Sequence, residues 1–181
     1  MSGFWRFLYE FLLGLGAKPA GAQGPTLTYV TAFGGPPQPP PGLDESRDLA
    51  HAHPLLRERF LKLQEAYELE TGRRLFLTSV YRSPRRQAEL FQVGRRGVLG
   101  ERVVTNCDGT QKKSQHNYYP ARAVDCAIDI DPGPGKVVTW NEADFDPLGL
   151  LGIKYGLVWG GFWTSFRDLP HLQLHDREGW A

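Results

Sequence analysis

Hydrophobic side chains recur with two different spacings along residues 43–181, and each spacing predicts a type of element. Intervals of three and four residues are typical of helices, whereas short apolar runs bounded by turn residues are typical of strands. Ser83-Pro84 has the form of a helix N-cap followed by proline at the first helical position. In chain order, the predicted elements are a helix over 55–70, a strand over 74–80, a helix over 84–94, a strand over 123–130, a helix over 141–155 and a strand over 171–175.

This order of helices and strands predicts an α+β fold, in which a small antiparallel sheet is flanked by helices. The polar, turn-rich stretch 97–113 is expected to be a loop. A length of 181 residues fits one domain plus an appendage better than two full domains. We therefore expect residues 43–181 to form the domain and residues 1–42 to form the appendage.

The appendage has its own composition. Residues 4–15 place apolar side chains on one helical face, with Arg6 and Glu10 opposite, and so predict an amphipathic helix. This helix could dock on the domain, contact a membrane surface or a partner, or belong to a secretory signal, because residues 20–22 have the form of a cleavage site. Half of the chain's 14 prolines fall within residues 17–42, which predicts an extended Pro/Gly-rich arm.

Charge and cysteine content exclude several classes of protein. Twenty-one Lys and Arg residues against 20 Asp and Glu residues give a net charge of +1, which argues against a protein that mainly binds nucleic acid. The two cysteines, Cys107 and Cys126, cannot build a disulfide framework, although they can be two free thiols or one bridge. No apolar stretch reaches the length of about 18 to 20 residues that a membrane span needs.

Two of the five histidines have a carboxylate at a spacing that could bring the groups together. Asp125 follows His116 by nine residues, on the predicted strand 123–130, and Asp168 precedes His171 by three. Two imidazoles and one carboxylate with an open fourth position are the ligand set of a catalytic zinc site, which leaves Asp168 as a general base. Buried histidines and aspartates that only hydrogen-bond to their neighbours are the alternative.

The remaining candidates are weighed in the same way. His51 and His53 precede a predicted helix with no acid or thiol nearby to complete a metal site, so we expect surface or capping roles for them. Arg82 follows the predicted strand 74–80, where a guanidinium facing a cleft could hold a carboxylate or a developing oxyanion.

Five short motifs occur in order and together resemble a known family. They are Ser79-x-Tyr81-Arg82-Ser83-x-x-x-Gln87, Ser114-x-His116, Ala123-Val124-Asp125, Gly156-Leu157-x-Trp159-Gly160-Gly161-x-Trp163 and Asp168-x-Pro170-His171. The series is similar to the zinc peptidoglycan peptidases of the VanY and phage endolysin type. That family contains D-alanyl-D-alanine carboxypeptidases and L-alanyl-D-glutamate endopeptidases, and the resemblance runs from residue 55 to residue 175.

The resemblance implies a role for each matching residue. It makes His116, Asp125 and His171 the ligands of one zinc ion, Asp168 the catalytic acid/base, and Arg82 the group that polarises the scissile carbonyl. The residues expected near the substrate are Ser114, Gln87 and Trp159. Trp159 and Trp163 could both form a wall of the cleft or belong to the core, and the core is favoured for Trp163.

One spacing departs from the family pattern. Many members place the aspartate closer to the histidine than the nine residues that separate His116 from Asp125 here. Asp129, on the same face of the predicted strand, is therefore kept as an alternative ligand.

The resemblance implies a zinc-dependent hydrolase whose partner is the peptidoglycan stem peptide, and we expect this chain to be a monomer. The acid at position 168 is aspartate rather than glutamate, which is more typical of the endolysin branch and of L-alanyl-D-glutamate cleavage. D-alanyl-D-alanine carboxypeptidase activity and a non-catalytic wall-binding module are the alternatives. A phage lysin would stay in the host cytoplasm until its release to the cell wall, whereas an N-terminal signal would make the protein secreted or periplasmic.

Overall fold

The computed structural model describes residues 36–131, 133–176 and 178. The helix expected over residues 4–15 and most of the Pro/Gly-rich arm over 17–42 lie outside the described residues. Both features therefore remain predictions, as does the division of the chain at residue 42.

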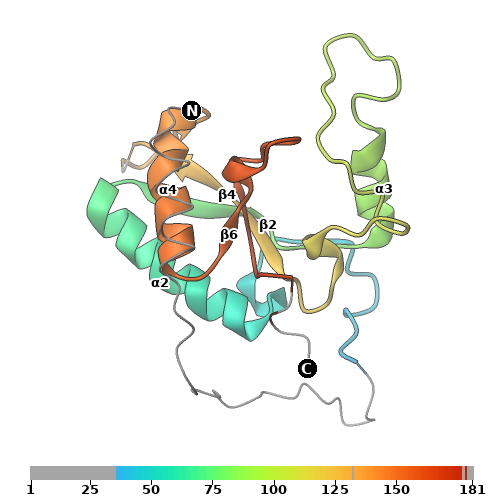
Figure 1. The fold of residues 1–181 in the computed structure, drawn as a ribbon, viewed down its shortest axis with the longest axis horizontal. Coiled ribbons are helices and arrows are strands. Elements are labelled where there is room, and N and C mark those ends of the chain that lie inside the picture. Colours follow the sequence, from blue (N-terminus) through green and yellow to red (C-terminus); the bar gives the residue numbers. More distant parts are fainter. Residues whose placement is uncertain (1–35, 132, 177, 179–181) are drawn as a thin grey trace. The chain divides into compact units, whose positions relative to one another are not determined.

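An antiparallel sheet of five strands forms the centre of the described part (Figure 1). Its strands are, in spatial order, β2 (Arg74–Ser79), β4 (Ala123–Asp129), β7 (His171–Gln173) and β6 (Val158–Trp159), and β5 (Val138–Thr139) pairs with the end of β4. A separate two-stranded ribbon joins β1 (Glu45–Ser46) to β3 (Tyr81–Arg82). All these strand pairs are antiparallel, which confirms the predicted fold class.

Three α-helices surround the sheet within the described residues: α2 (Pro54–Thr71), α3 (Pro84–Gln92) and α4 (Glu142–Lys154). Helices α2 and α4 pack against each other, and α2 also contacts β2 (Figure 1). Strand β4 is buried along its whole length, so the predicted apolar strand lies at the centre of the core. None of the helices in this part of the chain is both long and apolar enough to cross a bilayer.

Local sequence explains where the helices begin and end. The Ser83 hydroxyl accepts a hydrogen bond from the Arg86 backbone N–H at 3.1 Å, and proline follows at the first position of α3, as predicted. His53 Nδ1 accepts from the Leu55 N–H at 3.2 Å, which confirms a capping role for this histidine. Helix α2 ends at Gly72, whose φ of 68° is in the left-handed region that glycine adopts without strain.

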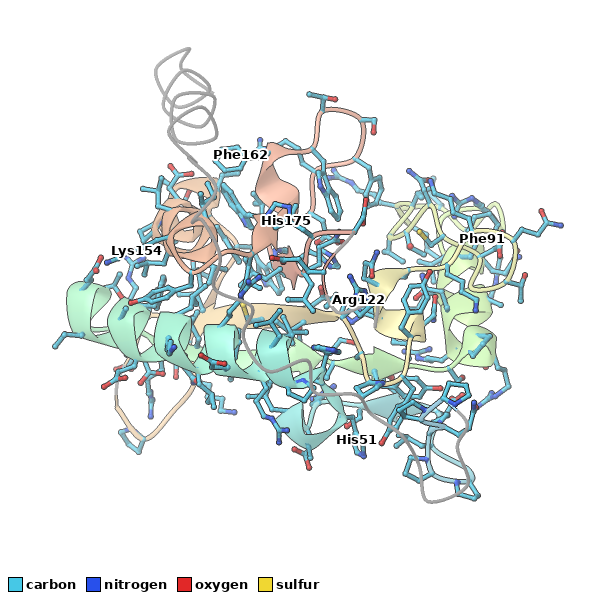
Figure 2. All side chains as sticks on the ribbon, turned by 60° about the horizontal axis from the view of Figure 1, so that its bottom comes forward. His51, Phe91, Arg122, Lys154, Phe162 and His175 are labelled. Carbon is cyan, nitrogen blue, oxygen red and sulfur yellow. The ribbon has the colours of Figure 1, made fainter. Side chains whose placement is uncertain are left out.

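The segment that follows β7 is tied back to the domain by two arginines. The buried Arg122 guanidinium donates to the His175 carbonyl at 2.8 Å, and these two residues lie near each other in Figure 2. Arg59 of α2 donates to both carboxylate oxygens of Glu178, at 2.7 and 3.1 Å, and to the Gly156 carbonyl at 2.7 Å. These contacts lie beyond the C-terminal end of β7. They hold this strand, which carries the candidate site residue His171, against the body of the domain.

The indole of Trp159 packs between two glycines. A Cβ atom on Gly149 of α4 would lie 2.1 Å from Trp159 Cε3, and one on Gly161 would lie 2.3 Å from Cε2. Trp159 is only 3% exposed, and its Nε1–H donates to the Leu169 carbonyl at 2.7 Å. The glycine- and tryptophan-rich motif is therefore a packing unit that joins α4 to β6.

We expect Gly149→Ala to destabilise the protein by about 2 kcal/mol, because overpacking costs about 1–3 kcal/mol and outweighs the better helix propensity of alanine. Urea unfolding of the purified chain would measure the free energy of unfolding. Gly135→Ala is the matched control, since a Cβ there meets nothing within 4 Å and the stability should stay within about 0.5 kcal/mol. Equal midpoints for both variants would contradict this packing arrangement.

Candidate metal centre and active site

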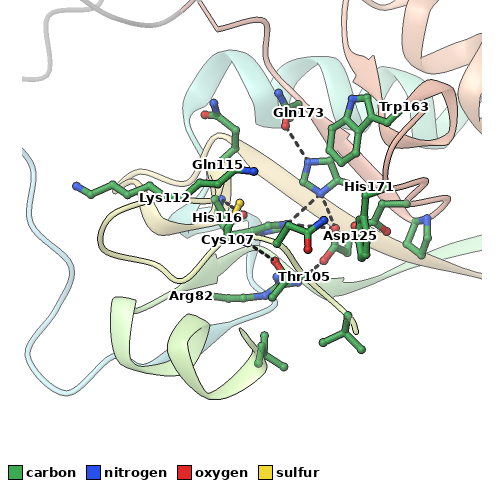
Figure 3. A pocket seen from close by; sticks show the side chains of 18 of the residues that line it. Arg82, Thr105, Cys107, Lys112, Gln115, His116, Asp125, Trp163, His171 and Gln173 are labelled. Carbon is green, nitrogen blue, oxygen red and sulfur yellow. Dashed lines mark hydrogen bonds and ion pairs between the residues drawn. The ribbon is translucent and has the colours of Figure 1, made fainter. Parts of the chain in front are cut away.

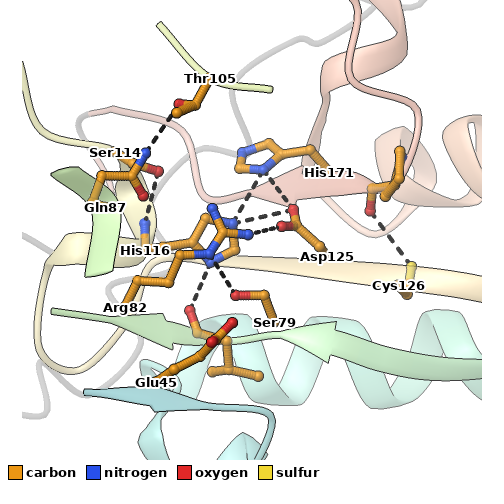
Figure 4. Close-up of polar contacts among 12 residues, drawn as sticks. Glu45, Ser79, Arg82, Gln87, Thr105, Ser114, His116, Asp125, Cys126 and His171 are labelled. Carbon is orange, nitrogen blue, oxygen red and sulfur yellow. Dashed lines mark hydrogen bonds and ion pairs between the residues drawn. The ribbon is translucent and has the colours of Figure 1, made fainter. Parts of the chain in front are cut away.

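Three side chains from separate segments meet at one point. They are His116, from the short 3₁₀ helix η2 (Gln115–Asn117), Asp125 from β4 and His171 from β7. His116 Nε2 lies 3.1 Å from Asp125 Oδ1 and 3.3 Å from His171 Nδ1, and His171 Nδ1 lies 2.9 Å from the same carboxylate oxygen (Figure 4). All three residues are buried.

Strand register and a capped turn bring these residues together. Asp125 and His171 are direct cross-strand partners in the β4–β7 pair. His116 lies in η2, where the Ser114 hydroxyl accepts from the His116 N–H and the Asn117 side chain accepts from the Ser114 N–H, at 3.3 and 2.8 Å. The site is thus built on a sheet and a closed turn rather than on a free loop.

The outward-facing atom of each of these side chains has its own partner. His116 Nδ1 lies 2.7 Å from the Val80 carbonyl, and His171 Nε2 lies 2.9 Å from Gln173 Oε1. Carbonyl oxygens only accept, so these ring nitrogens carry the protons and the other nitrogen of each neutral ring presents a lone pair to the centre. The second oxygen of Asp125 accepts from the Arg82 guanidinium.

This donor set fits a zinc ion. Two nitrogen lone pairs and a carboxylate oxygen face one another at 2.9 to 3.3 Å, an arrangement that repels itself unless a cation lies between them. Tetrahedral zinc with bonds of about 2.0–2.1 Å places its ligand atoms about 3.3 Å apart. The residues present would therefore hold zinc through His116, Asp125 and His171.

The electrostatics of the three side chains favour a bound cation. Burial alone would raise the pKa of Asp125, but its contacts with both imidazoles and with the Arg82 guanidinium hold it well below its usual range. Burial lowers the pKa of His116, which keeps that ring neutral. Burial also acts to lower the pKa of His171, but its hydrogen bond to Asp125 outweighs this effect and raises the pKa, so a proton and a metal compete for the same nitrogen.

Asp129 does not join this centre. Its carboxylate lies 3.0 Å from the Arg74 guanidinium and accepts the Val137 and Asp131 backbone N–H groups at 3.0 and 3.2 Å. These contacts occupy the Asp129 carboxylate at the end of β4 that pairs with β5, away from Asp125. Of the two aspartates considered from the sequence, the structure brings only Asp125 to the histidines.

The centre opens into a cavity of about 450 Å³ (Figure 3). Arg82, Ser114 and Asp168 line it together with the two histidines and Asp125, so these six candidates come from four motifs that lie far apart in sequence. Burial, reinforced by the charge of Asp125, raises the pKa of the Asp168 carboxyl to about 6. A carboxyl with a pKa near neutrality beside a metal centre is suited to acid/base work.

Gly160 allows Asp168 and His171 to lie where they do. A Cβ atom at this position would lie 2.5 Å from the Asp168 carbonyl oxygen and 3.1 Å from His171 Cβ. The Asp168 N–H donates to the Gly160 carbonyl at 3.1 Å, and the His171 N–H donates to the Asp168 carbonyl at 3.3 Å. The glycine of the motif is thus a close-approach site for the loop that carries both residues.

The two tryptophans of the motif lie in different surroundings. Trp159, expected near the substrate, is buried between glycines and does not line the cavity. Trp163, expected in the core, lines the cavity, with its ring 5.0 Å from the His171 ring (Figure 3). The physical reason is that Gly149 and Gly161 provide space for only the first indole.

Gln87, which is expected near the substrate, lies behind the wall of the cavity. Its side chain is fully buried and does not line the cavity; instead its amide donates to Thr105 Oγ1 and to the Cys107 carbonyl, both at 3.0 Å. Thr105 and Cys107 do line the cavity, so Gln87 supports its wall from behind (Figure 4). Cys107 and Cys126 are both free thiols, so the alternative of one bridge is not adopted.

Arg82 lines the cavity as expected and has a partner that the sequence did not indicate. Its Nε–H donates to Ser79 Oγ at 2.8 Å, and a terminal N–H donates to Asp125 (Figure 4). Gln173 was also missed, although its position two residues after His171 on a strand puts both on one face. That alternation was the available signal.

Comparison with known proteins agrees with this geometry. A family model described as D-alanyl-D-alanine carboxypeptidase matches residues 108–174, a segment that contains both histidines, Asp125 and Asp168. Peptidoglycan L-alanyl-D-glutamate endopeptidase CwlK of Bacillus subtilis (strain 168) is 28% identical over 131 residues, covering 67% of this chain and 72% of that protein.

The resemblance to the VanY-type peptidoglycan peptidases is confirmed. A solved structure, the L-Ala D-Glu endopeptidase ChiX of Serratia marcescens, is also similar, at 23% identity and a TM-score of 0.49 over 70% of this chain and 83% of that one. The segment matched by the family model begins after Arg82 and Gln87, so the VanY-type match itself says nothing of these two residues.

Proposed function

We propose that this chain is a zinc-dependent peptidase that cleaves the bond between L-alanine and D-glutamate in the peptidoglycan stem peptide. The observation that carries the proposal is the convergence of two imidazole lone pairs and the Asp125 carboxylate at the floor of a cavity that Asp168 also lines. Zinc, when bound there, supplies Lewis-acid polarisation of a carbonyl and makes water a stronger acid.

The chain's own residues would divide the remaining work. Asp168, as a carboxylate, takes the proton of the attacking water and then returns it to the nitrogen of the leaving amine. Arg82 offers N–H donors to the charge that develops on the scissile carbonyl oxygen, while its bond to Asp125 holds that carboxylate in place. Trp163 covers the ring of His171 on the cavity side and limits access of water.

Two observations favour the endopeptidase over the carboxypeptidase. The acid at position 168 is aspartate, and CwlK, an L-alanyl-D-glutamate endopeptidase by name, is similar over two thirds of the chain. The description of the family model favours D-alanyl-D-alanine carboxypeptidase, which is the second candidate.

Mass spectrometry of purified muropeptides after digestion separates the two activities. We expect release of a peptide that begins at D-glutamate, with the terminal D-alanine retained. Loss of a single terminal D-alanine would instead establish the carboxypeptidase. No change in any muropeptide by zinc-loaded protein would favour the non-catalytic wall-binding module.

We also propose that the protein acts as a monomeric phage lysin that remains in the host cytoplasm until it is released to the wall. Residues 4–15, outside the described part, would make any contact with the membrane surface. Expression in bacterial cytoplasm with and without a holin tests this role, since lysis is expected only with the holin. Lysis without a holin would favour the alternative of an N-terminal export signal.

The pH dependence of hydrolysis should follow Asp168. A general base must be ionised, and burial raises the pKa of this carboxyl to about 6, so kcat is expected to fall about tenfold per pH unit below that value. Rates measured between pH 4.5 and 8 would check this, with zinc content determined at each pH because protons also compete for the histidines. A flat profile at constant zinc content would rule out Asp168 as the base.

A further inference from the structure

On the basis of the metal centre of the proposed function, we propose that Gln173 is a positioning residue for that centre. Its side-chain carbonyl holds the ring proton of His171 on Nε2 and so presents the Nδ1 lone pair to the metal. The contact is direct, with His171 Nε2 2.9 Å from Gln173 Oε1 (Figure 3).

Strand geometry places Gln173 where this contact is possible. Residues two apart on a strand project to the same face, so Gln173 and His171 lie side by side on β7. Gln173, like Leu172, pairs with both neighbouring strands, through Ala123 of β4 and Val158 of β6. Its backbone is therefore fixed from two sides, which leaves only the side chain to adjust.

Packing holds the His171 ring but does not choose its protonated nitrogen. Trp163 lies 5.0 Å from the ring at a tilt of 48°, and Gly160 leaves space against the Cβ atom. These contacts are the same for either tautomer, whereas the hydrogen bond at Nε2 is not. An amide oxygen carries no hydrogen, so it accepts only from a protonated Nε2, and Nδ1 is then free for a metal.

The other two outer contacts are less suited to a test of this arrangement. His116 is held by the Val80 backbone carbonyl, which no substitution removes. Asp125 is held by Arg82, which also lines the cavity and would contact substrate, so its loss would have two effects. Gln173 also lines the cavity, so its role is tested by zinc affinity in the absence of substrate rather than by the rate of hydrolysis.

Zinc affinity of the full chain, measured by competition with a chromogenic chelator, tests the assignment. Gln173→Met keeps the length of the side chain but removes the acceptor, and we expect zinc to bind about 10–100-fold more weakly. Gln173→Glu keeps an acceptor oxygen and should bind zinc at least as tightly as the unsubstituted chain. Gln64→Met is the control, because Gln64 makes two side-chain hydrogen bonds on α2 away from the centre and its loss should leave zinc affinity unchanged.

A spectroscopic readout distinguishes a tautomer effect from loss of packing. In zinc-loaded protein, ¹⁵N shifts of the unsubstituted chain should report His171 with a proton on Nε2, and Gln173→Met should shift that signal because the proton loses its carbonyl acceptor. A zinc-loaded unsubstituted chain with no proton on His171 Nε2 would overturn the assignment without any variant. Equal zinc affinity of the Met variant and the unsubstituted chain, or equal weakening by Met and Glu, would overturn it as well.

These outcomes are independent of which peptide bond is cut. If zinc affinity follows the expected order but muropeptides remain intact, Gln173 keeps its role and the proposed peptidase fails. If muropeptides are cleaved but Gln173→Met binds zinc normally, the peptidase stands and the role of Gln173 fails. Absence of zinc binding by the unsubstituted chain would overturn both the metal centre and this role.

Discussion

Asp168→Asn is expected to lower kcat by about 10²–10⁴-fold while the protein keeps one zinc ion per chain. Asp168 lines the cavity, but it is not part of the cluster formed by His116, Asp125 and His171. Asparagine has nearly the same shape as aspartate and cannot take up a proton from water. Hydrolysis of muropeptides and metal analysis on the same preparation would measure both quantities.

The same substitution should change stability in a pH-dependent way. Burial raises the pKa of Asp168 to about 6 in the folded state. Ionisation of this carboxyl at pH 7.5 therefore opposes folding. The stability that its protonated form contributes is lost as the pH rises through about 6. Metal-free Asp168→Asn should therefore be more stable than the unsubstituted chain by about 1–2 kcal/mol at pH 7.5 and nearly equal to it at pH 4. Urea unfolding at both pH values would measure the difference.

A suitable control for Asp168 is Asp48→Asn. Asp48 is exposed and caps a short 3₁₀ helix through the Ala50 N–H at 2.8 Å, a role that asparagine fills equally well. Neither rate nor stability should change. If Asp168→Asn lost zinc together with activity, Asp168 would be a ligand rather than an acid/base, and if it kept full activity, the proton would be moved by another group.

Most elements could be predicted because their signals are local. The spacing of apolar residues placed α2, β2, β4 and α4 within a few residues of their observed bounds, and Ser83 marked the start of α3. The last strand was expected to reach His175 but ends at Gln173, where the backbone leaves the sheet and the His175 carbonyl accepts from Arg122 instead.

The sequence could predict only those site residues whose own short motif indicates a chemical role. Histidines are few, so their spacing from nearby aspartates and the order of the motifs were enough to nominate the residues that the fold brings together. Which groups hold them in place depends on strand register, which the sequence does not state. The Arg82–Asp125 contact joins residues of two different strands and was therefore missed, whereas the His171–Gln173 contact lies within one strand and only its alternation indicates it.

The tryptophans show where local reasoning fails. Trp159 and Trp163 lie in the same motif, and nothing in their immediate sequence says which one faces the cavity. The difference arises from Gly149, on a helix ten residues earlier, whose missing side chain makes space for the Trp159 indole. Burial of an aromatic side chain is thus decided by the element that packs across from it.

His116→Ala is expected to remove both zinc binding and hydrolysis. The substitution deletes one of only two nitrogen ligands and the hydrogen bond to the Val80 carbonyl. A site left with one imidazole and one carboxylate should bind zinc at least about 10²-fold more weakly, which exceeds the effect expected for loss of an outer hydrogen bond. Muropeptide cleavage should then fall to the background level even where Asp168 is intact.

Comparison with His175→Ala makes this result specific to the centre. His175 is exposed, lies four residues beyond His171 and does not line the cavity, so its replacement should leave zinc content and activity unchanged. Circular dichroism of both variants would show whether the fold is kept.

Zinc should also raise the thermal stability of the metal-free unsubstituted chain. Asp125 repels the two inward lone pairs unless a cation lies between them, and bound zinc removes this repulsion. His116→Ala should gain little thermal stability from zinc. A His116→Ala protein that still bound one zinc ion and cleaved muropeptides would show that the metal is held elsewhere.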